Sequence, residues 1–134
     1  MEPFFMGLDA SKGYADFMII DRHKRPVIKD FQLDDTFDGH RCLYNFLGRF
    51  LVDHPDSTVF AGMESTGGYE NNWYNSLLQF QRSLNIQTAR LNPLGVVYNS
   101  KAGLKKNKTD PISAHNVAEY LVAHPEKVTY QKDD

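Results

Sequence analysis

Three acidic residues stand where secondary-structure elements are expected to end or begin. Asp9 and Glu64 each close a short apolar run, and Asp110 directly precedes a proline at the expected start of a helix. A charge at the end of an apolar strand is costly unless something offsets it. Because all three residues mark the ends of elements, a single fold can bring them to one end of a sheet.

Three carboxylates in one place repel one another, and a divalent cation relieves that repulsion. Mg²⁺ prefers oxygen ligands, usually one or two carboxylates together with water and substrate phosphate. Two such ions roughly 4 Å apart activate water and stabilise a leaving oxygen. The acids therefore predict a site for Mg²⁺ or Mn²⁺ whose substrate is a phosphodiester. For Asp110 alone, an ordinary helix cap is the better interpretation, so the prediction depends on the three together.

Composition is that of an ordinary globular protein. The chain has 134 residues, 41% of them apolar, and a formal charge of −2, so any surface for nucleic acid must be local. The single cysteine, Cys42, excludes an internal disulfide and is expected to be a small buried residue. No apolar run approaches the roughly 20 residues that span a bilayer, which predicts a cytoplasmic protein without a membrane partner.

The first half of the chain predicts a meander of three strands followed by a helix. Residues 4–8, 15–20 and 27–33 are strand candidates separated by short, turn-rich segments. A helix is expected to start at residues 34–36 and to stop before Pro55.

The second half alternates strands and helices. Residues 59–63 predict a buried strand that ends in Glu64, and Gly67-Gly68 predicts a strand-to-helix turn. A helix with Trp73 and Leu77 on its apolar face is expected to run to Leu84. A strand follows at 86–91, then a short helix at 94–98, and then a helix that begins at Asp110 and ends before Pro125.

This order indicates an α/β domain with a mixed central sheet flanked by helices, in a ribonuclease-H-like arrangement. The sheet is expected to combine the antiparallel meander with two further strands. We place the domain at residues 1–125. Residues 126–134 lack an apolar repeat and are expected to fray or to begin a linker.

Three blocks of sequence resemble a known family. GLDASKGYADFMIID, MESTGGYENNW and LNPLGVVYNSKAGLKKNKTDPISAHNVAEYL look like the successive blocks of the RuvC-like DEDD domain of insertion-sequence transposases and Piv-type invertases. The likeness covers most of the chain, from about Gly7 to Leu121. It implies a DNA recombinase with a Mg²⁺-binding acidic cluster, guided by a structured RNA and assembled as a homo-oligomer.

The resemblance also assigns the acids by position. Asp9 corresponds to the first, Glu64 to the second and Asp110 to the third. The fourth, three residues further on, is replaced by Ser113, whose neutral hydroxyl is a weaker ligand for a hard cation. The family's C-terminal domain, which carries a nucleophilic serine, has no counterpart in these 134 residues, so this chain alone is not expected to complete recombination.

A basic run precedes the third acid. A solvated loop and a phosphate-binding loop account equally well for its composition, and the family likeness favours nucleic acid. Lys12, in the turn after Asp9, is a weaker candidate for the same role. Tyr69, Trp73 and Tyr74 are possible base-stacking groups, although the helical spacing of Trp73 favours the core. The lysines of the run are Lys101, Lys105, Lys106 and Lys108.

Two alternatives belong to other functional classes. The loss of the fourth acid at Ser113 is also what a non-catalytic domain that binds nucleic acid or mediates assembly would show. The early hairpin with Asp9 also occurs in actin-like ATPase lobes, but that fold needs a second lobe that 134 residues do not hold.

Overall fold

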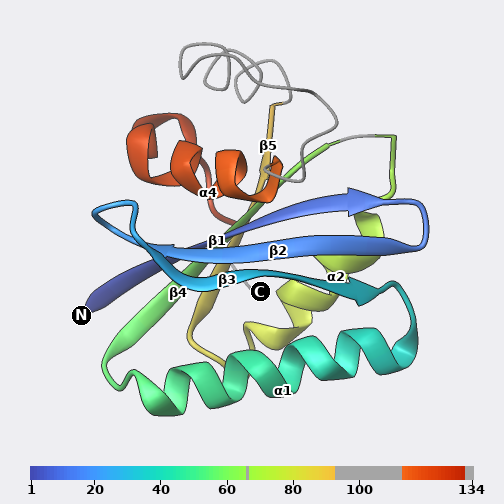
Figure 1. Ribbon diagram of the computed structural model, residues 1–134, viewed down its shortest axis with the longest axis horizontal. Helices are drawn as coiled ribbons and strands as arrows, with labels where there is room; N and C mark the ends of the chain where they lie inside the picture. Colours follow the sequence, from blue (N-terminus) through green and yellow to red (C-terminus); the bar gives the residue numbers. More distant parts are fainter. Residues whose placement is uncertain (66, 93–112, 132–134) are drawn as a thin grey trace.

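A mixed sheet of five strands forms the centre of the molecule, with helices on both of its faces (Figure 1). The computed structural model describes residues 1–65, 67–92 and 113–131. The strands lie in the order β3-β2-β1-β4-β5. This arrangement confirms the predicted ribonuclease-H-like architecture of a meander extended by two further strands.

The meander consists of β1 (Glu2–Ser11), β2 (Tyr14–Asp21) and β3 (Pro26–Asp34), each antiparallel to the next. Gly13 takes a positive φ of 89° in the tight turn between β1 and β2, where glycine avoids a steric cost. The strands β4 (Ser57–Glu64) and β5 (Ile86–Leu91) extend the sheet in parallel to β1.

Helices α1 (Phe37–Asp53) and α2 (Asn71–Phe80) cover one face of the sheet (Figure 1). As predicted, α1 is capped by Thr36, whose hydroxyl accepts from the Gly39 N–H at 3.0 Å, and ends before Pro55. The predicted extension of α2 to Leu84 is wrong. The chain leaves the helix after Phe80 to turn into β5, and Leu84 still reaches the core from that turn.

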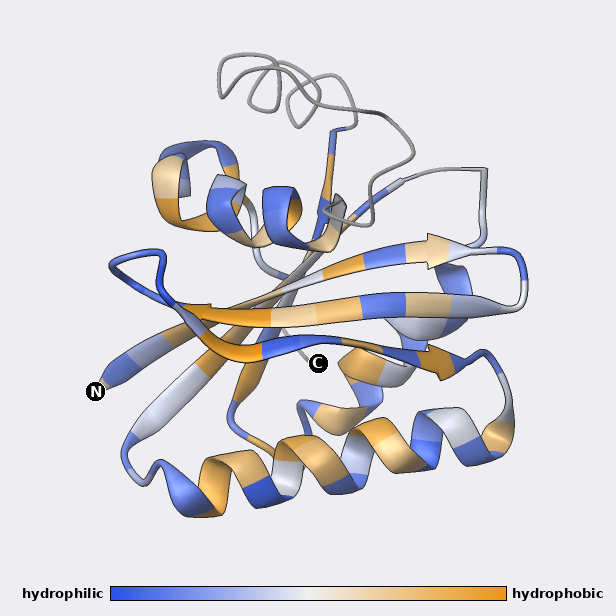
Figure 2. Ribbon diagram, viewed as in Figure 1, coloured by the Kyte–Doolittle hydropathy of each residue, from blue (hydrophilic) through white to orange (hydrophobic). Residues whose placement is uncertain are grey.

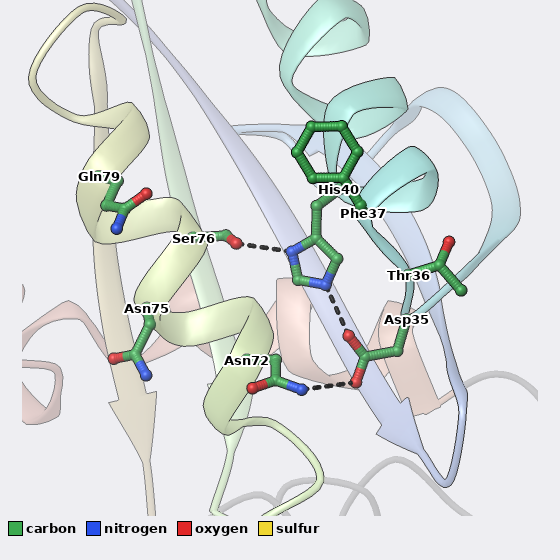
Figure 3. A pocket seen from close by; sticks show the side chains of 8 residues that line it. All are labelled: Asp35, Thr36, Phe37, His40, Asn72, Asn75, Ser76 and Gln79. Atoms are coloured by element: carbon green, nitrogen blue, oxygen red, sulfur yellow. Dashed lines mark hydrogen bonds and ion pairs between the residues drawn. The ribbon is translucent and has the colours of Figure 1, made fainter.

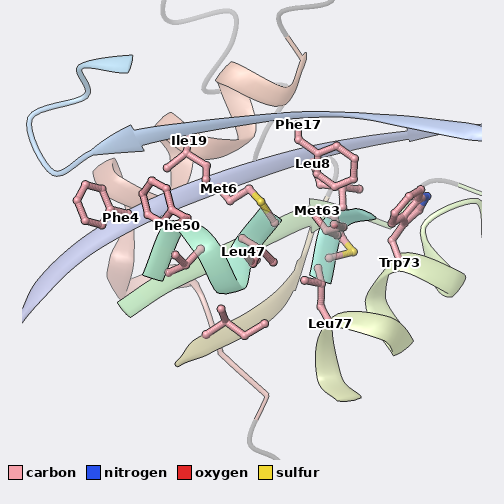
Figure 4. Close-up of a cluster of buried hydrophobic side chains, with 14 of the residues drawn as sticks. Phe4, Met6, Leu8, Phe17, Ile19, Leu47, Phe50, Met63, Trp73 and Leu77 are labelled. Atoms are coloured by element: carbon pink, nitrogen blue, oxygen red, sulfur yellow. The ribbon is translucent and has the colours of Figure 1, made fainter. Parts of the chain in front are cut away.

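The main core lies between the sheet and this pair of helices (Figure 4). Alternate residues of each central strand point into it, because successive side chains of a strand face opposite sides. The hydropathy colouring shows hydrophobic and hydrophilic residues recurring along α1 (Figure 2). The strand residues that fill the core are Phe4, Met6 and Leu8 of β1, Ala15, Phe17 and Ile19 of β2, and Val59, Ala61 and Met63 of β4.

Helix α4 (Ser113–Ala123) packs on the opposite face of the sheet, over β1 (Figure 1). A Cβ atom added at Gly7 would overlap the carbonyl oxygen of Ala114 and would lie 2.6 Å from the nitrogen of Ala118. One added at Gly62 would lie 2.8 Å from a methyl carbon of Leu121. The two glycines therefore let the helix backbone approach the sheet closely.

The segment after α4 packs on the sheet rather than fraying, at least as far as Gln131. It forms the short helix η1 (Pro125–Lys127), after which the Tyr130 ring packs on Phe60 with a centroid distance of 5.1 Å. The Gln131 N–H donates to the Thr88 carbonyl at 2.7 Å. Burial raises the pKa of the Tyr130 phenol. The sequence did not predict the packing of Tyr130 on Phe60, because a single aromatic residue makes no apolar repeat. The domain boundary at residue 125 stays a prediction.

One expectation about a single residue is also wrong. Cys42 is exposed, because it lies on the outward side of α1 while its neighbour Leu43 points into the core.

The predicted helix at 94–98 and the predicted start of the last helix at Asp110 fall outside the described residues. None of the helices in the described ranges is long and apolar enough to cross a membrane.

The close approach of α4 predicts that Gly7 cannot be enlarged. We expect Gly7→Ala to lower the free energy of unfolding by about 3 kcal/mol, because the added methyl group meets backbone atoms that cannot move aside. Thermal and urea unfolding measure this.

The matched control is Gly48→Ala in the middle of α1. Its added Cβ would meet nothing closer than Leu84 at 3.9 Å, and alanine favours a helix over glycine by about 0.5–1 kcal/mol. Gly48→Ala should therefore stabilise the protein. Equal effects of the two substitutions would refute the packing role of Gly7.

Candidate metal centre

Asp9 and Glu64 lie side by side on the face of the sheet that carries α4. Leu8 of β1 is in register with Met63 of β4, and both side chains enter the main core. The next residue on each strand therefore points to the opposite face, which places Asp9 and Glu64 together. Asp9 does not end its strand as predicted: β1 continues to Ser11, because the hairpin with β2 extends beyond β4.

The electrostatics of Glu64 reflect this neighbourhood. Burial raises the pKa of the Glu64 carboxyl, and the negative charge of Asp9 raises it further. Two carboxylates that repel each other in a partly desolvated place suit a hard divalent cation. Within the described residues no group of three or more His, Cys, Asp or Glu side chains could hold a metal ion. A cation held by Asp9 and Glu64 would therefore need a ligand from outside the described ranges, or water.

The start of α4 lies close to the same place. Ser113 is the first residue of the helix, and Ala114 sits against Gly7, two residues before Asp9 in β1. Asp110 lies three residues before Ser113 in the sequence, outside the described residues, as do Lys101, Lys105, Lys106 and Lys108. Lys12 is described, and it is exposed in the hairpin turn at this end of β1.

The turn after Glu64 joins β4 to α2 at the same end of the sheet. The Ser65 N–H donates to the Leu91 carbonyl at 3.3 Å, and the Asn71 N–H donates to the Gly68 carbonyl at 3.1 Å. Gly67 and Gly68 have φ values of 69° and 92°, a region that favours glycine. The predicted strand-to-helix turn is therefore confirmed.

An ion pair between buried Glu70 and exposed Arg90 fastens this turn to β5, and the sequence did not predict it. Glu70 is only 2% exposed and forms an ion pair with Arg90, whose Nε atom lies 3.6 Å from Glu70 Oε2. The same guanidinium donates to Asn71 Oδ1 at 3.1 Å and lies 4.1 Å from the centroid of the Tyr74 ring. Tyr74 thus stacks on an arginine, whereas Tyr69 is 49% exposed. Arg90 is in register with Met63, which points into the main core, so this ion pair lies on the α2 side of the sheet, opposite the face that carries Glu64.

A second polar network connects α1 to α2 on the far side of the sheet (Figure 3). The His40 Nδ1 atom lies 2.6 Å from Ser76 Oγ, and Nε2 lies 2.6 Å from Asp35 Oδ1. The imidazole stacks on Trp73 with centroids 3.9 Å apart. His40 is thus half-buried and holds structural contacts to both helices. Trp73 is fully buried, as its helical spacing predicts.

This network lines a cavity of about 350 Å³ but lacks the parts of a hydrolytic site. Ser76, His40 and Asp35 are connected in the order of a Ser-His-Asp catalytic triad. Ser76, however, lies inside α2, so its own backbone N–H is bonded within the helix and does not stabilise an oxyanion. The arrangement therefore serves to hold the two helices together.

The raised pKa of Glu64 predicts how stability depends on pH. In the folded protein the pKa lies above its usual value of 4.5, so folding favours the protonated form. The contribution to stability is complete below the usual pKa and is lost as pH rises through the folded pKa. We expect the metal-free protein to lose stability as pH rises from the usual pKa of 4.5, and Glu64→Gln to reduce that loss. Urea unfolding across this range measures it. The control Glu2→Gln removes an exposed carboxylate at the other end of the sheet. If Glu2→Gln reduced the pH dependence of the free energy of unfolding as much as Glu64→Gln does, Glu64 would not be its source.

Comparison with known proteins places the chain in a family. A model of the IS110-type DEDD transposases, described as a transposase, matches residues 6–134. No curated protein matches the chain significantly. Among solved structures, RuvC of T. thermophilus in complex with a Holliday junction substrate aligns with a TM-score of 0.63 at 10% identity, over 96% of this chain and 99% of that chain. A second Thermus thermophilus RuvC structure aligns with the same TM-score and coverage at 8% identity. These likenesses show a RuvC-like fold, and the chain belongs to the IS110-type family of DEDD transposases.

Proposed function

We propose that this chain is the metal-dependent catalytic domain of a transposase that acts on DNA phosphodiesters. The observation that carries the proposal is the pairing of Asp9 with Glu64 on one face of the sheet, where the pKa of Glu64 is raised. A protein gains no stability from placing two carboxylates together in a partly buried site. Such a pair is suited to binding a cation.

In this proposal Asp9, Glu64 and Asp110 hold Mg²⁺ or Mn²⁺. The bound cation would neutralise phosphate charge, promote ionisation of water and stabilise the leaving oxygen. Asp9 and Glu64 are positioned by neighbouring strands, and Asp110 would reach them from the segment before α4. Ser113 occupies the place of the fourth acid and brings no charge, which lowers the expected affinity for the cation.

The proposed substrate is DNA, and lysines are the proposed contacts to its phosphates. Lys12 projects from the hairpin turn beside Asp9, and the basic run at 101–108 precedes Asp110 in the sequence. Such contacts neutralise phosphates without reading sequence. A structured guide RNA, a homo-oligomer and a separate C-terminal domain with a nucleophilic serine complete the proposal; they rest on the family likeness.

A non-catalytic role in binding nucleic acid or in assembly is the second candidate, and Ser113 is the observation that favours it. The two candidates differ in metal binding, which only the first requires. The family match describes a transposase, so an actin-like ATPase lobe has no support from the comparisons.

The metal site predicts binding of Mn²⁺ by the isolated chain. We expect calorimetric titration to show binding to the wild type and a loss of roughly tenfold or more in affinity for Asp9→Asn, because a charged ligand becomes neutral. The control is Asp30→Asn, which removes an exposed carboxylate from the edge strand β3 and should bind like the wild type. Negligible binding by all three proteins would reject the catalytic proposal in favour of the second candidate.

The basic run predicts salt-sensitive binding of nucleic acid. We expect Lys105→Ala with Lys106→Ala to weaken binding of a four-way DNA junction or a structured RNA, and to reduce the salt dependence of log K by about 1–2 units of slope. Fluorescence anisotropy at several salt concentrations measures both. The matched control, Lys29→Ala with Lys127→Ala, removes the same charge from elsewhere on the chain. If Lys105→Ala with Lys106→Ala left the affinity for nucleic acid unchanged, the proposed role of the basic run in phosphate binding would be refuted.

A further inference from the structure

A fourth carboxylate lies next to the candidate site, on a strand rather than on a helix. Asp16 of β2 is the direct partner of Asp9 in the antiparallel register of β1 and β2. Side chains of such directly opposed residues lie on the same face, with Cβ atoms about 4.5–5.5 Å apart. Like charges in this position destabilise a sheet.

The face that Asp16 occupies follows from its neighbours. Ala15 and Phe17, on either side of it, are fully buried in the main core beneath α1 and α2. Asp16 therefore points to the opposite face, the one that carries α4. Its Oδ1 atom accepts a hydrogen bond from the Gln32 side chain at 3.1 Å. The bond engages one carboxylate oxygen toward β3.

Asp16, Asp9 and Glu64 consequently form a row across three adjacent strands, β2, β1 and β4. Neighbouring strands are about 4.8 Å apart, so the row brings Asp16 within two strand spacings of Glu64. Its three members do not close into a direct metal-binding set among the described residues. At this spacing Asp16 can act on a cation through its charge and through bound water.

The start of α4 connects this row with the missing acid. The first turn of the helix lies over Gly7, whose partner on β2 is Met18, two residues from Asp16. Ser113, the first residue of α4, is therefore at the same end of the sheet as the row and carries no charge.

Given the proposed metal centre, on which this inference rests, we propose that Asp16 is an outer carboxylate of that centre. It supplies from β2 the negative charge that Ser113 does not supply from α4. Asp16 then contacts the hydration water of the cation and is not a direct ligand. Carboxylates on directly opposed residues repel each other in the metal-free protein, and a bound cation would offset that repulsion.

The first test is Asp16→Asn, with Mn²⁺ alone as the probe. Calorimetry should show affinity about tenfold weaker than that of the wild type, in the range known for outer partners of metal ligands. Thermal unfolding without metal should show the variant at least as stable as the wild type, because a repulsion has been removed. A purely structural role of Asp16 would instead lower the unfolding temperature and leave Mn²⁺ affinity unchanged. That result would overturn the proposal.

The second test moves the charge back to the helix. Ser113→Asp should raise Mn²⁺ affinity in the wild type, and in Asp16→Asn it should restore affinity to near the wild-type value. Ser113→Asn is the matched control, since it adds similar volume without charge and should restore nothing. Rescue by both substitutions, or by neither, would contradict the exchange of charge between Asp16 and Ser113.

The two proposals fail in different ways. If the wild type binds no Mn²⁺, the metal centre itself is rejected. If the wild type binds Mn²⁺ and Asp9→Asn does not, while Asp16→Asn binds like the wild type, the metal centre stands and the role of Asp16 alone is rejected.

Discussion

The close approach of α4 to the sheet is the constraint on which the rest of the site depends. Gly7 and Gly62 leave no side chain between the helix and the two central strands, so the helix backbone rests on the strand backbone. This contact brings the first turn of α4 to the strand that carries Asp9. With larger residues at these two positions the helix would stand further from the sheet, and its first turn would move away from the strand that carries Asp9. The glycines thus serve the site as well as the packing.

The same face of the sheet accepts an electrostatic cost that the opposite face does not. Beneath α1 and α2 the strands contribute only apolar side chains to the main core. On the other face Asp16, Asp9 and Glu64 stand on consecutive strands, and the charge of Asp9 contributes to the raised pKa of Glu64. Repulsion of this kind is tolerated only when hydrophobic burial elsewhere outweighs it. One face of the sheet forms the main apolar core, and the stability that this core supplies allows the other face to carry the acidic residues.

Much of this arrangement was predictable from the sequence because it rests on local patterns. Apolar runs ending in Asp9 and Glu64 indicated the strands, and Thr36 and Pro55 marked the limits of α1. What escaped prediction depends on pairing between distant segments. The opposition of Asp16 to Asp9 requires the hairpin register, the clamp of Glu70 by Arg90 requires β5 beside β4, and the stacking of His40 on Trp73 requires two helices to meet. No spacing along the chain encodes these contacts directly.

The way the acids are held also bears on how the site tolerates change. Asp16, Asp9 and Glu64 take their places from backbone hydrogen bonds between strands, and the turn after Glu64 is held by the pair of Glu70 and Arg90. This ion pair joins a buried carboxylate to an exposed guanidinium, and it ties the turn to β5. Since backbone pairing sets the positions, replacing one side chain at the helix does not disturb the others. In the proposed metal centre, a neutral residue at position 113 would remove charge without disturbing the strands, and Asp16 on the neighbouring strand would offset that loss.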